Sequence, residues 1–310
     1  MTNYTYVLLA GRTGNQLFQI AAGEYCLLNS RTPNQKLGFI VSKTTPKTFL
    51  AINQNIVQVN YLISKLLNYL LSRGVQPRNR WRSILLGAVN SFCKCLLAIK
   101  LRSIDIDLQV AKSVNAPPEL DAGTKKITIY VGYFQNYYWQ SLDKEMHKQL
   151  SNYVQRCYIR IFPPYEITAT SVVVHLRRTD YAQNPELGLL SDLFYQTALE
   201  DIFSKIEPFD IYIVTDDRKF KAEYFAKQLL VREVFTPERM TDAEAFEFMR
   251  RASNLLISNS SFAWWAAYLK YGEDTKRLVV FPSPWFRTLD GLKDFPKPWI
   301  GIQSFWVNSP

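Results

Sequence analysis

The sequence predicts an α/β protein with a doubly wound, parallel sheet, and three features of the chain predict it. Short β-favouring runs alternate with helical patterns, an order typical of parallel strands joined by helices. Ser171 to Leu176 (SVVVHL) is a nearly continuous β-branched run, as in a strand buried on both faces. Near the start, Tyr4 to Leu9 leads through the turn Gly11-Arg12-Thr13-Gly14 into a helical pattern, which indicates a strand, a tight turn and a helix N-terminus.

The first half of the chain contains few strand signals and several helices. Tyr4 to Leu9 predicts a strand, and Leu17 to Leu28 has apolar residues at helical spacing. Residues 60–71 predict an amphipathic helix, and Ile84 to Leu101 predicts a second one. Lys126 to Phe134 (KITIYVGYF) predicts another strand.

The second half alternates regularly between strands and helices. After Ser171 to Leu176, the predicted elements are a helix at Asp192–Lys205, a strand at Phe209–Thr215, a helix at Lys219–Gln228, a helix at Ala243–Ala252, a strand at Asn254–Ser258, a helix at Ser261–Tyr271 and a closing strand at Arg277–Phe281. The pattern changes around Pro163-Pro164, so we expect two domains, residues 1–165 and 166–310.

Composition excludes several classes of protein. With 310 residues, of which 47% are hydrophobic and 21% charged, the chain is not a disordered, collagenous or coiled-coil protein. Four irregularly spaced cysteines and two histidines predict free thiols in a reducing compartment and no zinc site.

The chain also shows no clear targeting or membrane signal. Its start, MTNYTYVLLA, lacks the basic residues and cleavage site of a signal peptide. The most apolar later stretch, Ser83 to Ile99, is interrupted by Asn90 and Lys94 and is shorter than the about 20 apolar residues of a membrane span. We therefore expect a cytoplasmic protein that is soluble or lies peripherally on the inner membrane face.

Positive charge is concentrated in one region. The net charge is +10, and between Glu24 and Asp105 the chain has no acidic residue. Twelve basic residues lie in that interval, and the rest of the chain is nearly neutral. A regional excess of this kind favours contact with an anionic surface or substrate.

Polar clusters follow three predicted strands of the second half. They are His175-Leu176-Arg177-Arg178-Thr179-Asp180-Tyr181, Thr215-Asp216-Asp217 and Ser258-Asn259-Ser260-Ser261-Phe262. Ligands of open α/β sheets bind outside the carboxyl ends of the strands. Arginines bind phosphates in bidentate fashion, a helix N-terminus binds anions, and aspartates hold ribose or base donors. Taken singly, the arginines are more often solvated, Asn-Ser-Ser a helix cap and His175 structural, but together they predict a nucleotide-diphosphate site.

Four motifs resemble the bacterial α-1,2-fucosyltransferases and occur in that family's order. They are Gly11-Arg12-Thr13-Gly14-Asn15-Gln16-Leu17-Phe18-Gln19, Val131-Gly132-Tyr133-Phe134-Gln135, His175 to Tyr181, and Ile257-Ser258-Asn259-Ser260-Ser261-Phe262-Ala263-Trp264-Trp265-Ala266-Ala267. The resemblance implies a GT-B-like enzyme, with two Rossmann-like domains facing a cleft. It implies inverting transfer of L-fucose from GDP-β-L-fucose to a galactoside, without a metal or other cofactor.

The resemblance also assigns roles to residues. Arg177 or Arg178 would bind the β-phosphate and stabilise departing GDP, and Asn15 would approach the donor from the other domain. Asn259, Ser260 and Ser261 would hold phosphates, and His175 and Asp217 would position the nucleotide. The full set expected to bind substrate is Gly14, Gln16, His175, Asp216, Asp217, Asn259, Ser260, Ser261 and Phe262. Asp180 is the candidate base for the acceptor hydroxyl, with capping of the following turn as an equal alternative.

The opening motif departs from the family at Ala10 and Arg12, and Gly-Arg-x-Gly-Asn-Gln is similar to protein O-fucosyltransferases instead. The acceptor class therefore stays open between an oligosaccharide, a lipid-linked glycan and other acceptors. Peripheral contact with an anionic membrane is a further expectation, from the basic region and its two amphipathic helices.

Two other functions compete with this one. Asp105-Ile106-Asp107 is a D-x-D sequence, which chelates a divalent metal in metal-dependent glycosyltransferases. Alternation with Ile104 and Leu108 favours an ordinary polar strand face there. A non-catalytic module binding nucleic acid or membranes is the second alternative, but the basic residues lack interleaved aromatic residues, so we expect no nucleic-acid partner.

Overall fold

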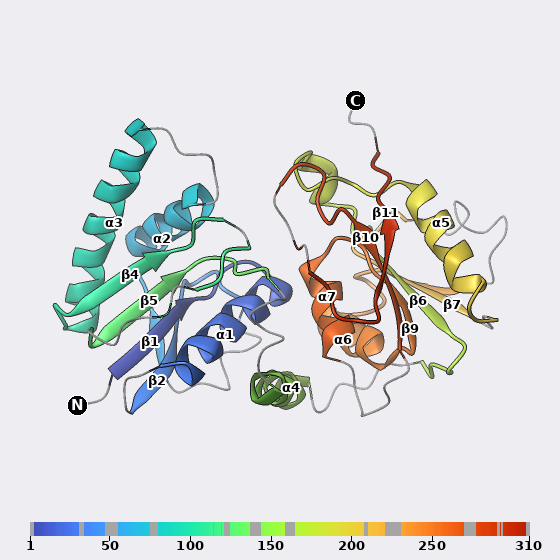
Figure 1. Cartoon of the computed structure of the whole chain (residues 1–310), viewed down its shortest axis with the longest axis horizontal. Coiled ribbons are helices and arrows are strands. Elements are labelled where there is room, and N and C mark those ends of the chain that lie inside the picture. The colour runs from blue at the N-terminus through green and yellow to red at the C-terminus, as the bar shows by residue number, and fades with distance from the viewer. Residues whose placement is uncertain are drawn as a thin grey trace. The chain divides into compact units, whose positions relative to one another are not determined.

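The computed structural model divides into two compact units, Met1–Cys157 and Tyr158–Pro310 (Figure 1). The residues described are 3–30, 34–46, 55–74, 80–113, 115–118, 120, 125–136, 144–158, 165–207, 210–220, 231–269, 277–289, 292 and 294–307. The domain boundary expected at residue 165 falls shortly after this division.

The first unit is built on a five-stranded parallel sheet. In spatial order its strands are β3 (Ile56–Gln58), β2 (Gln35–Val41), β1 (Asn3–Leu8), β5 (Ile127–Val131) and β4 (Ile106–Val110). The chain runs outward from β1 to β3 and then returns to the other side of β1, so the topological switch lies between β1 and β5. A ligand site is expected where the carboxyl ends of these two strands diverge.

Helices cover both faces of this sheet (Figure 1). Helix α1 (Thr13–Leu28) packs on β1 and β2, while α2 (Tyr61–Gly74) and α3 (Arg80–Leu101) pack on the opposite face. Leu67 of α2, Cys93 and Leu97 of α3 and Ile129 of β5 are fully buried in the core between them. Helix α4 (Lys144–Tyr158) is joined to α1 by the Tyr153 hydroxyl, which donates to the Glu24 carboxylate at 2.7 Å.

The second unit contains a six-stranded parallel sheet. Its spatial order is β11 (Ile300–Gln303), β10 (Leu278–Ser283), β9 (Asn254–Leu256), β6 (Val172–Leu176), β7 (Ile211–Thr215) and β8 (Val231–Phe235). The first strand in sequence, β6, lies at the centre, and the chain leaves it on one side and comes back on the other at β9. This is the strand order of a dinucleotide-binding fold, with its switch point between β6 and β9.

Among the described residues, three α-helices flank this second sheet. Helix α5 (Asp192–Phe203) lies on one face, and α6 (Asp242–Arg251) and α7 (Ser261–Tyr268) lie on the other (Figure 1). A short 3₁₀ turn, η2 (Tyr181–Gln183), follows the arginine motif. Buried Arg277 donates to the carbonyl oxygens of Ala266 and Ala267 near the end of α7 and to Met249 of α6, which ties the two helices together.

The predicted fold class is confirmed by these two parallel, doubly wound sheets. Most predicted elements are present within a few residues, and the helix expected at Lys219–Gln228 lies largely outside the described residues. The prediction that Arg277–Phe281 closes the series is wrong, because β11 follows it. Strands β2, β3, β8 and β11 were not predicted. Strands β3, β8 and β11 are short or carry charges, as in VREVF, and lack an apolar run. Strand β2 does contain the apolar run LGFIV, so its omission is an error in reading the sequence.

The prediction that the apolar stretch in α3 is too short for a membrane span is also wrong. Ser83–Leu101 forms 19 residues of helix with a mean hydropathy of 1.7, which is long and apolar enough to cross a membrane. Only 11% of that stretch is buried. Cys93 and Leu97 nevertheless pack in the core, so α3 has apolar residues on both its covered and its exposed side.

Candidate functional site

Three polar loops meet at the switch point of the second unit. His175 is the next-to-last residue of β6, Asp216 follows β7 directly, and Ser258 lies just past β9. These strands are neighbours in the sheet and run in the same direction, so their carboxyl ends share one edge. The structure therefore brings together all three clusters that the sequence singled out.

Arg177 lies at the centre of this cluster. Its guanidinium forms ion pairs with Asp180 at 2.7 Å and with Asp216 at 3.2 Å. It also lies over the Tyr181 ring, 5.7 Å from its centroid. The Arg177 and Asp216 side chains are each 13% exposed, whereas Asp180 is 53% exposed, so one carboxylate partner of Arg177 is largely covered and the other faces solvent.

Asp216 organises the loop after β6. Its carboxylate accepts hydrogen bonds from the backbone N–H of Arg178 at 2.8 Å and from the Thr179 hydroxyl. Burial by itself raises the pKa of Asp216, but these hydrogen bonds and the nearby Arg177 charge hold it below its usual range. Asp216 is therefore an ionised carboxylate that fixes the arginine loop.

Arg178 has a different set of partners from its neighbour. Its guanidinium pairs with Asp192, the first residue of α5, at 3.1 Å. It also lies over the Phe220 ring, 5.4 Å from the centroid. Arg178 thus joins the arginine loop to α5 and to the loop after β7.

His175 is buried behind the arginines. Its Nδ1 lies 2.8 Å from the Ser258 hydroxyl, and its ring lies 6.1 Å from that of Phe262. Burial lowers the pKa of His175 to about 3, the Arg177 charge lowers it too, and Asp216 opposes the shift. The imidazole is therefore neutral at physiological pH, and it connects β6 to β9 across the switch point.

The two remaining acidic candidates bind local groups. Asp180 precedes η2 but makes no side-chain cap bond, so capping does not explain it, and its carboxylate contacts Arg177 instead. Asp217 accepts the backbone N–H of Lys219 at 2.9 Å. Asp217 thus closes the loop after β7.

The loop after β9 ends in the N-terminus of α7. Buried Asn259 donates to the carbonyl oxygens of Leu187 and Gly188, and its Oδ1 has no partner among the described residues. Ser260 is the N-cap of α7 but makes no side-chain cap bond, and the first turn has no acidic residue. In contrast, α6 begins with a complete capping box between Thr241 and Glu244. The positive end of α7 therefore lacks a side-chain cap at the switch point.

Four predicted residues lie around this N-terminus. Ser260 and Asn259 are buried, Ser261 and Phe262 are partly exposed, and Phe262 contacts the Phe246 ring edge-on. The Tyr181 hydroxyl donates to the Asn259 carbonyl oxygen at 2.8 Å, so the arginine loop and the α7 loop are directly bonded.

The first unit has its own polar cluster at the switch between β1 and β5. Gly11 has a φ of +75°, and a Cβ there would lie 2.6 Å from the Asn15 side chain, so only glycine fits this turn. Asn15 Oδ1 accepts a hydrogen bond from Gln135, which follows β5, at 3.0 Å. Gln19 donates to the Gly132 carbonyl oxygen and accepts from Ala10, which also joins the two strand ends.

Gly14 and Gln16 lie in the first turn of α1. Both are buried, and Gln16 donates to the carbonyl oxygens of Gly11 and Pro46. Its Oε1 has no partner among the described residues. The N-cap of α1, Arg12, makes no side-chain cap bond, so the start of this helix resembles that of α7.

The two aspartates of the D-x-D sequence, Asp105 and Asp107, bind protein groups. Asp105 pairs with Lys125 at 3.2 Å and accepts the backbone N–H of Lys126 at 2.9 Å, and these bonds lower its pKa. Asp107 accepts a hydrogen bond from Gln109 on the same strand. Within the part of the chain that the structure describes, no group of three or more His, Cys, Asp or Glu side chains could hold a metal.

Several residues of the two clusters were not predicted as site residues. They are Thr179, Asp192, Ser258 and Gln135. Thr179, Ser258 and Gln135 lie inside the quoted motifs, so the motifs were the available signal. Asp192 lies 14 residues from Arg178, and nothing in the local sequence connects them.

A family model and one of two relatives match nearly the whole chain, and the other relative matches less than half of it. Residues 5–303 match glycosyl transferase family 11. An Alpha-1,2-colitosyltransferase of Escherichia coli is 25% identical over 319 residues, covering 95% of this chain and 97% of that protein. The O-antigen biosynthesis glycosyltransferase WbnK of Escherichia coli is 30% identical over 138 residues, covering 43% of this chain and 45% of that protein.

Solved structures resemble the chain more distantly. The E. coli heptosyltransferase WaaC with ADP-2-deoxy-2-fluoro heptose has a TM-score of 0.48 and 11% identity. The alignment covers 96% of this chain and 92% of WaaC.

Proposed function

The chain belongs to glycosyl transferase family 11 and is a glycosyltransferase, and from this premise we propose that it transfers L-fucose from GDP-β-L-fucose to a galactoside hydroxyl. The proposed linkage is α-1,2, the reaction inverts the anomeric carbon, and no metal takes part. The proposed acceptor is an oligosaccharide or a lipid-linked glycan.

The observation that carries the proposal is the arginine cluster at the switch point of the second unit. Arg177 is held by one largely covered and one exposed carboxylate, Asp216 and Asp180. When a diphosphate binds, its oxygens replace the exposed partner Asp180, while Asp216 keeps the guanidinium in place. A fixed cation at the β-phosphate then stabilises the negative charge that develops on departing GDP.

The uncapped helix start supports the same placement of the donor. The N-cap of helix α7, Ser260, directly follows Asn259, and the Tyr181 hydroxyl of the arginine motif donates to the Asn259 carbonyl oxygen. The N-terminal N–H groups of α7 therefore lie close to the arginine motif. Anionic phosphate oxygens are stabilised at such a position. Asn259 Oδ1 provides a buried acceptor for a donor N–H or hydroxyl of the nucleotide.

Exchange of partners at Arg177 also gives Asp180 a role. The carboxylate released from Arg177 is exposed and lies three residues from the arginine, so it takes the proton of the acceptor hydroxyl as the sugar transfers. Buried His175 does not suit this role, because its ring lies behind the arginines and its Nδ1 is bonded to the Ser258 hydroxyl.

The colitosyl relative favours a second donor. Colitose is L-fucose without the hydroxyl at C3, so a site for one sugar is close in shape to a site for the other. GDP-colitose is therefore the alternative donor, and the two sugars must be compared directly.

The test is transfer with purified full-length protein. GDP-fucose and GDP-colitose are each incubated with a panel of β-galactosides in EDTA, and products are analysed by mass and linkage. We expect an α-1,2-linked product from GDP-fucose. Transfer from GDP-colitose alone would assign the alternative donor, and absence of transfer from both donors to every acceptor would disprove the proposal.

A matched pair of variants tests the arginine role. Arg177→Ala removes the cation, and Arg177→Lys keeps the charge without the bidentate geometry. We expect kcat to fall in both, further in Arg177→Ala, with folding monitored by circular dichroism. Unchanged turnover in folded Arg177→Ala would contradict the role.

A further inference from the structure

Helix α3 carries an apolar stripe on its exposed side. One side of the helix buries Cys93 and Leu97 in the core of the first unit. On the other side, four large side chains are each more than half exposed: Ile84, Leu85, Phe92 and Ile99. Residues 85, 88, 92, 95 and 99 are exposed and follow one another at spacings of three and four, so they form one line along the helix.

The size of this stripe is unusual for the surface of a water-soluble helix. Ser83–Leu101 has a mean hydropathy of 1.7, yet only 11% of it is buried. The exposed side of a surface helix is ordinarily polar. A long apolar patch in contact with water marks a surface that another partner covers.

The C-terminal end of α3 adds a second apolar group and several cations. The helix ends in a Schellman motif, in which Ser103 N–H donates to Ala98 and Arg102 N–H donates to Ile99. Arg102 has a φ of +51°, in a position that usually holds glycine. Ile104, two residues further, is 96% exposed.

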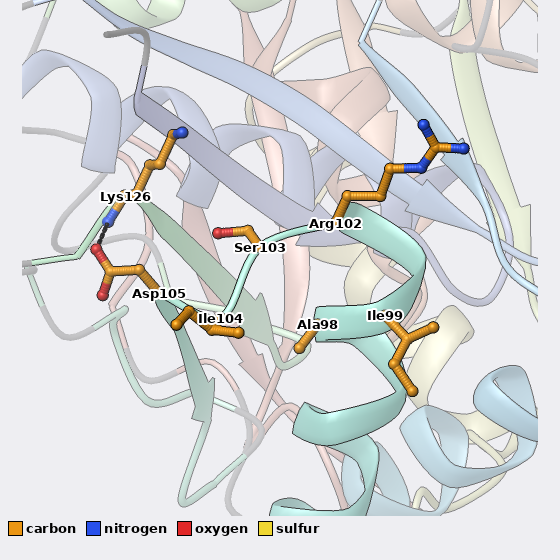
Figure 2. Close-up of a pocket in the computed structure, with 7 residues that line it drawn as sticks. All are labelled: Ala98, Ile99, Arg102, Ser103, Ile104, Asp105 and Lys126. Carbon is orange, nitrogen blue, oxygen red and sulfur yellow. Dashed lines mark hydrogen bonds between the residues drawn. The ribbon is translucent and has the colours of Figure 1, made fainter.

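A hollow of about 530 Å³ lies at this end of the helix, beside Ile104. Figure 2 shows Arg102 and Lys126 on opposite sides of it, with Ser103, Ile104 and Ala98 between them in this view. Asp105, the acidic side chain among the described residues that line it, is paired with Lys125. The described lining of the hollow therefore combines apolar side chains, Ala98, Ile99 and Ile104, with the cations Arg102 and Lys126.

We propose that the exposed side of α3, together with Ile104 and the cations at the end of the helix, is a docking surface for an anionic phospholipid bilayer. The helix lies parallel to the membrane plane, with its apolar stripe among the acyl chains and Lys100 and Arg102 among the headgroups. It does not cross the bilayer, because Cys93 and Leu97 stay in the core of the first unit.

Charge selects a bilayer over a second copy of the chain. Basic residues occur near both ends of α3, Arg80 and Arg82 at the start and Lys100 and Arg102 at the end. The chain has no acidic residue between Glu24 and Asp105. Two copies of α3 would therefore bring like charges together in parallel or antiparallel packing, whereas anionic lipids neutralise both ends.

The first experiment is vesicle co-sedimentation with the full-length protein and no nucleotide sugar. Vesicles of phosphatidylglycerol and phosphatidylethanolamine are compared with vesicles of phosphatidylcholine. We expect binding to the anionic vesicles at low salt and strong weakening near 0.5 M salt, where the screening length is about 4 Å. Equal binding to both kinds of vesicle, or binding to neither, would overturn the proposal.

Variants then test the apolar groups. In Ile99→Ser/Ile104→Ser, two exposed side chains lose their apolar surface, so binding to anionic vesicles should weaken at least tenfold. Leu193→Ser is the control for loss of an exposed apolar side chain elsewhere, because Leu193 is 52% exposed but lies on α5. Equal binding by the double variant and wild type would refute a contact through α3.

The position of Arg102 permits a test that separates charge from folding. Arg102→Gly relieves the left-handed backbone, so its melting temperature should equal or exceed that of wild type, while removal of the cation weakens lipid binding about fivefold. Arg102→Lys should restore most of the binding, since a bilayer responds to charge. Lys148→Gln removes an exposed cation from α4 and should leave binding unchanged.

Size-exclusion chromatography with light scattering tests whether a second copy of the chain binds the stripe instead of a bilayer. A wild-type dimer that Phe92→Ser converts to a monomer would assign the stripe to a second copy and overturn the lipid proposal. Sugar transfer to a soluble galactoside is measured separately, so failure of lipid binding leaves the proposed transferase activity standing, and the reverse also holds.

Discussion

The protonation of His175 leads to a quantitative prediction about stability. The ring is buried at the switch point of the second unit, bonded to Ser258 and close to Arg177. Its pKa is about 3 in the folded protein and 6.5 in the unfolded chain. As pH falls below 6.5, the unfolded chain binds a proton that the folded protein does not, so acid favours unfolding.

The size of the effect follows from the two pKa values. One pKa unit corresponds to about 1.4 kcal/mol, so lowering the pH from 7 to 5 removes roughly 2 kcal/mol of stability through this group. Asp216 has a lowered pKa and stays ionised across this range, so it does not add to the change. The loss should disappear in His175→Asn, which replaces the imidazole with a neutral amide that does not titrate.

Urea denaturation at pH 7 and pH 5 measures the difference. Five of the seven tryptophans lie in the second unit, at 264, 265, 285, 299 and 306, so intrinsic fluorescence reports mainly on the unit that contains His175. Between the two pH values, the urea midpoint of wild type should fall by about 1 M more than that of His175→Asn.

A further variant separates the charge effect from the hydrogen bond. Ser258→Ala removes the partner of the ring but leaves the imidazole buried, so it should lose about 1 kcal/mol at pH 7 and keep a pH dependence like that of wild type. Equal pH dependence in wild type and His175→Asn would mean that the ring is not held neutral, and the reasoning would be refuted.

Three other predictions concern catalysis and helix ends. Arg177→Ala should lose about 100-fold in kcat, whereas Arg178→Ala, which breaks the pair with Asp192, should mainly lower stability; near wild-type turnover in both would contradict the phosphate role. Transfer should persist in EDTA, and complete loss that Mn²⁺ restores would move the chemistry to Asp105. Thr241→Ala should lower the free energy of unfolding by about 1 kcal/mol in urea denaturation, because it breaks the capping box of α6. Ser260→Ala should leave the free energy of unfolding unchanged and raise the Kd for the donor. A large stability loss in Ser260→Ala would show that Ser260 is an ordinary helix cap.

The sequence indicated which residues form the candidate site, but it did not indicate which of them contact one another. The motif around Arg177 and Arg178 indicated anion binding, but the two arginines are equivalent in the sequence. The structure distinguishes them, since one pairs with Asp216 after β7 and the other with Asp192 at the start of α5. Sequence spacing carries no information about such pairs, because they form only after the strands align.

Asp180 and α3 show the same limit of local patterns. Capping was a reasonable alternative for a carboxylate before a turn, but Asp180 bonds to Arg177 and makes no cap. The apolar positions of α3 predicted an amphipathic helix. In the structure one set of them packs against the core and another is exposed, which hydrophobic spacing alone does not reveal.

The sequence alone determined the α/β class, most strands of the second sheet and which residue types gather at the strand ends, because backbone propensity and apolar periodicity are local properties of the chain. It did not reveal β2, β3, β8, β11 or α4. Only the tertiary structure decided that β6 and β9 are neighbours, and this places His175 against Ser258 and the arginine loop against the start of α7. It also decided the proton affinity of His175, since burial sets that value and burial depends on residues far apart in the chain.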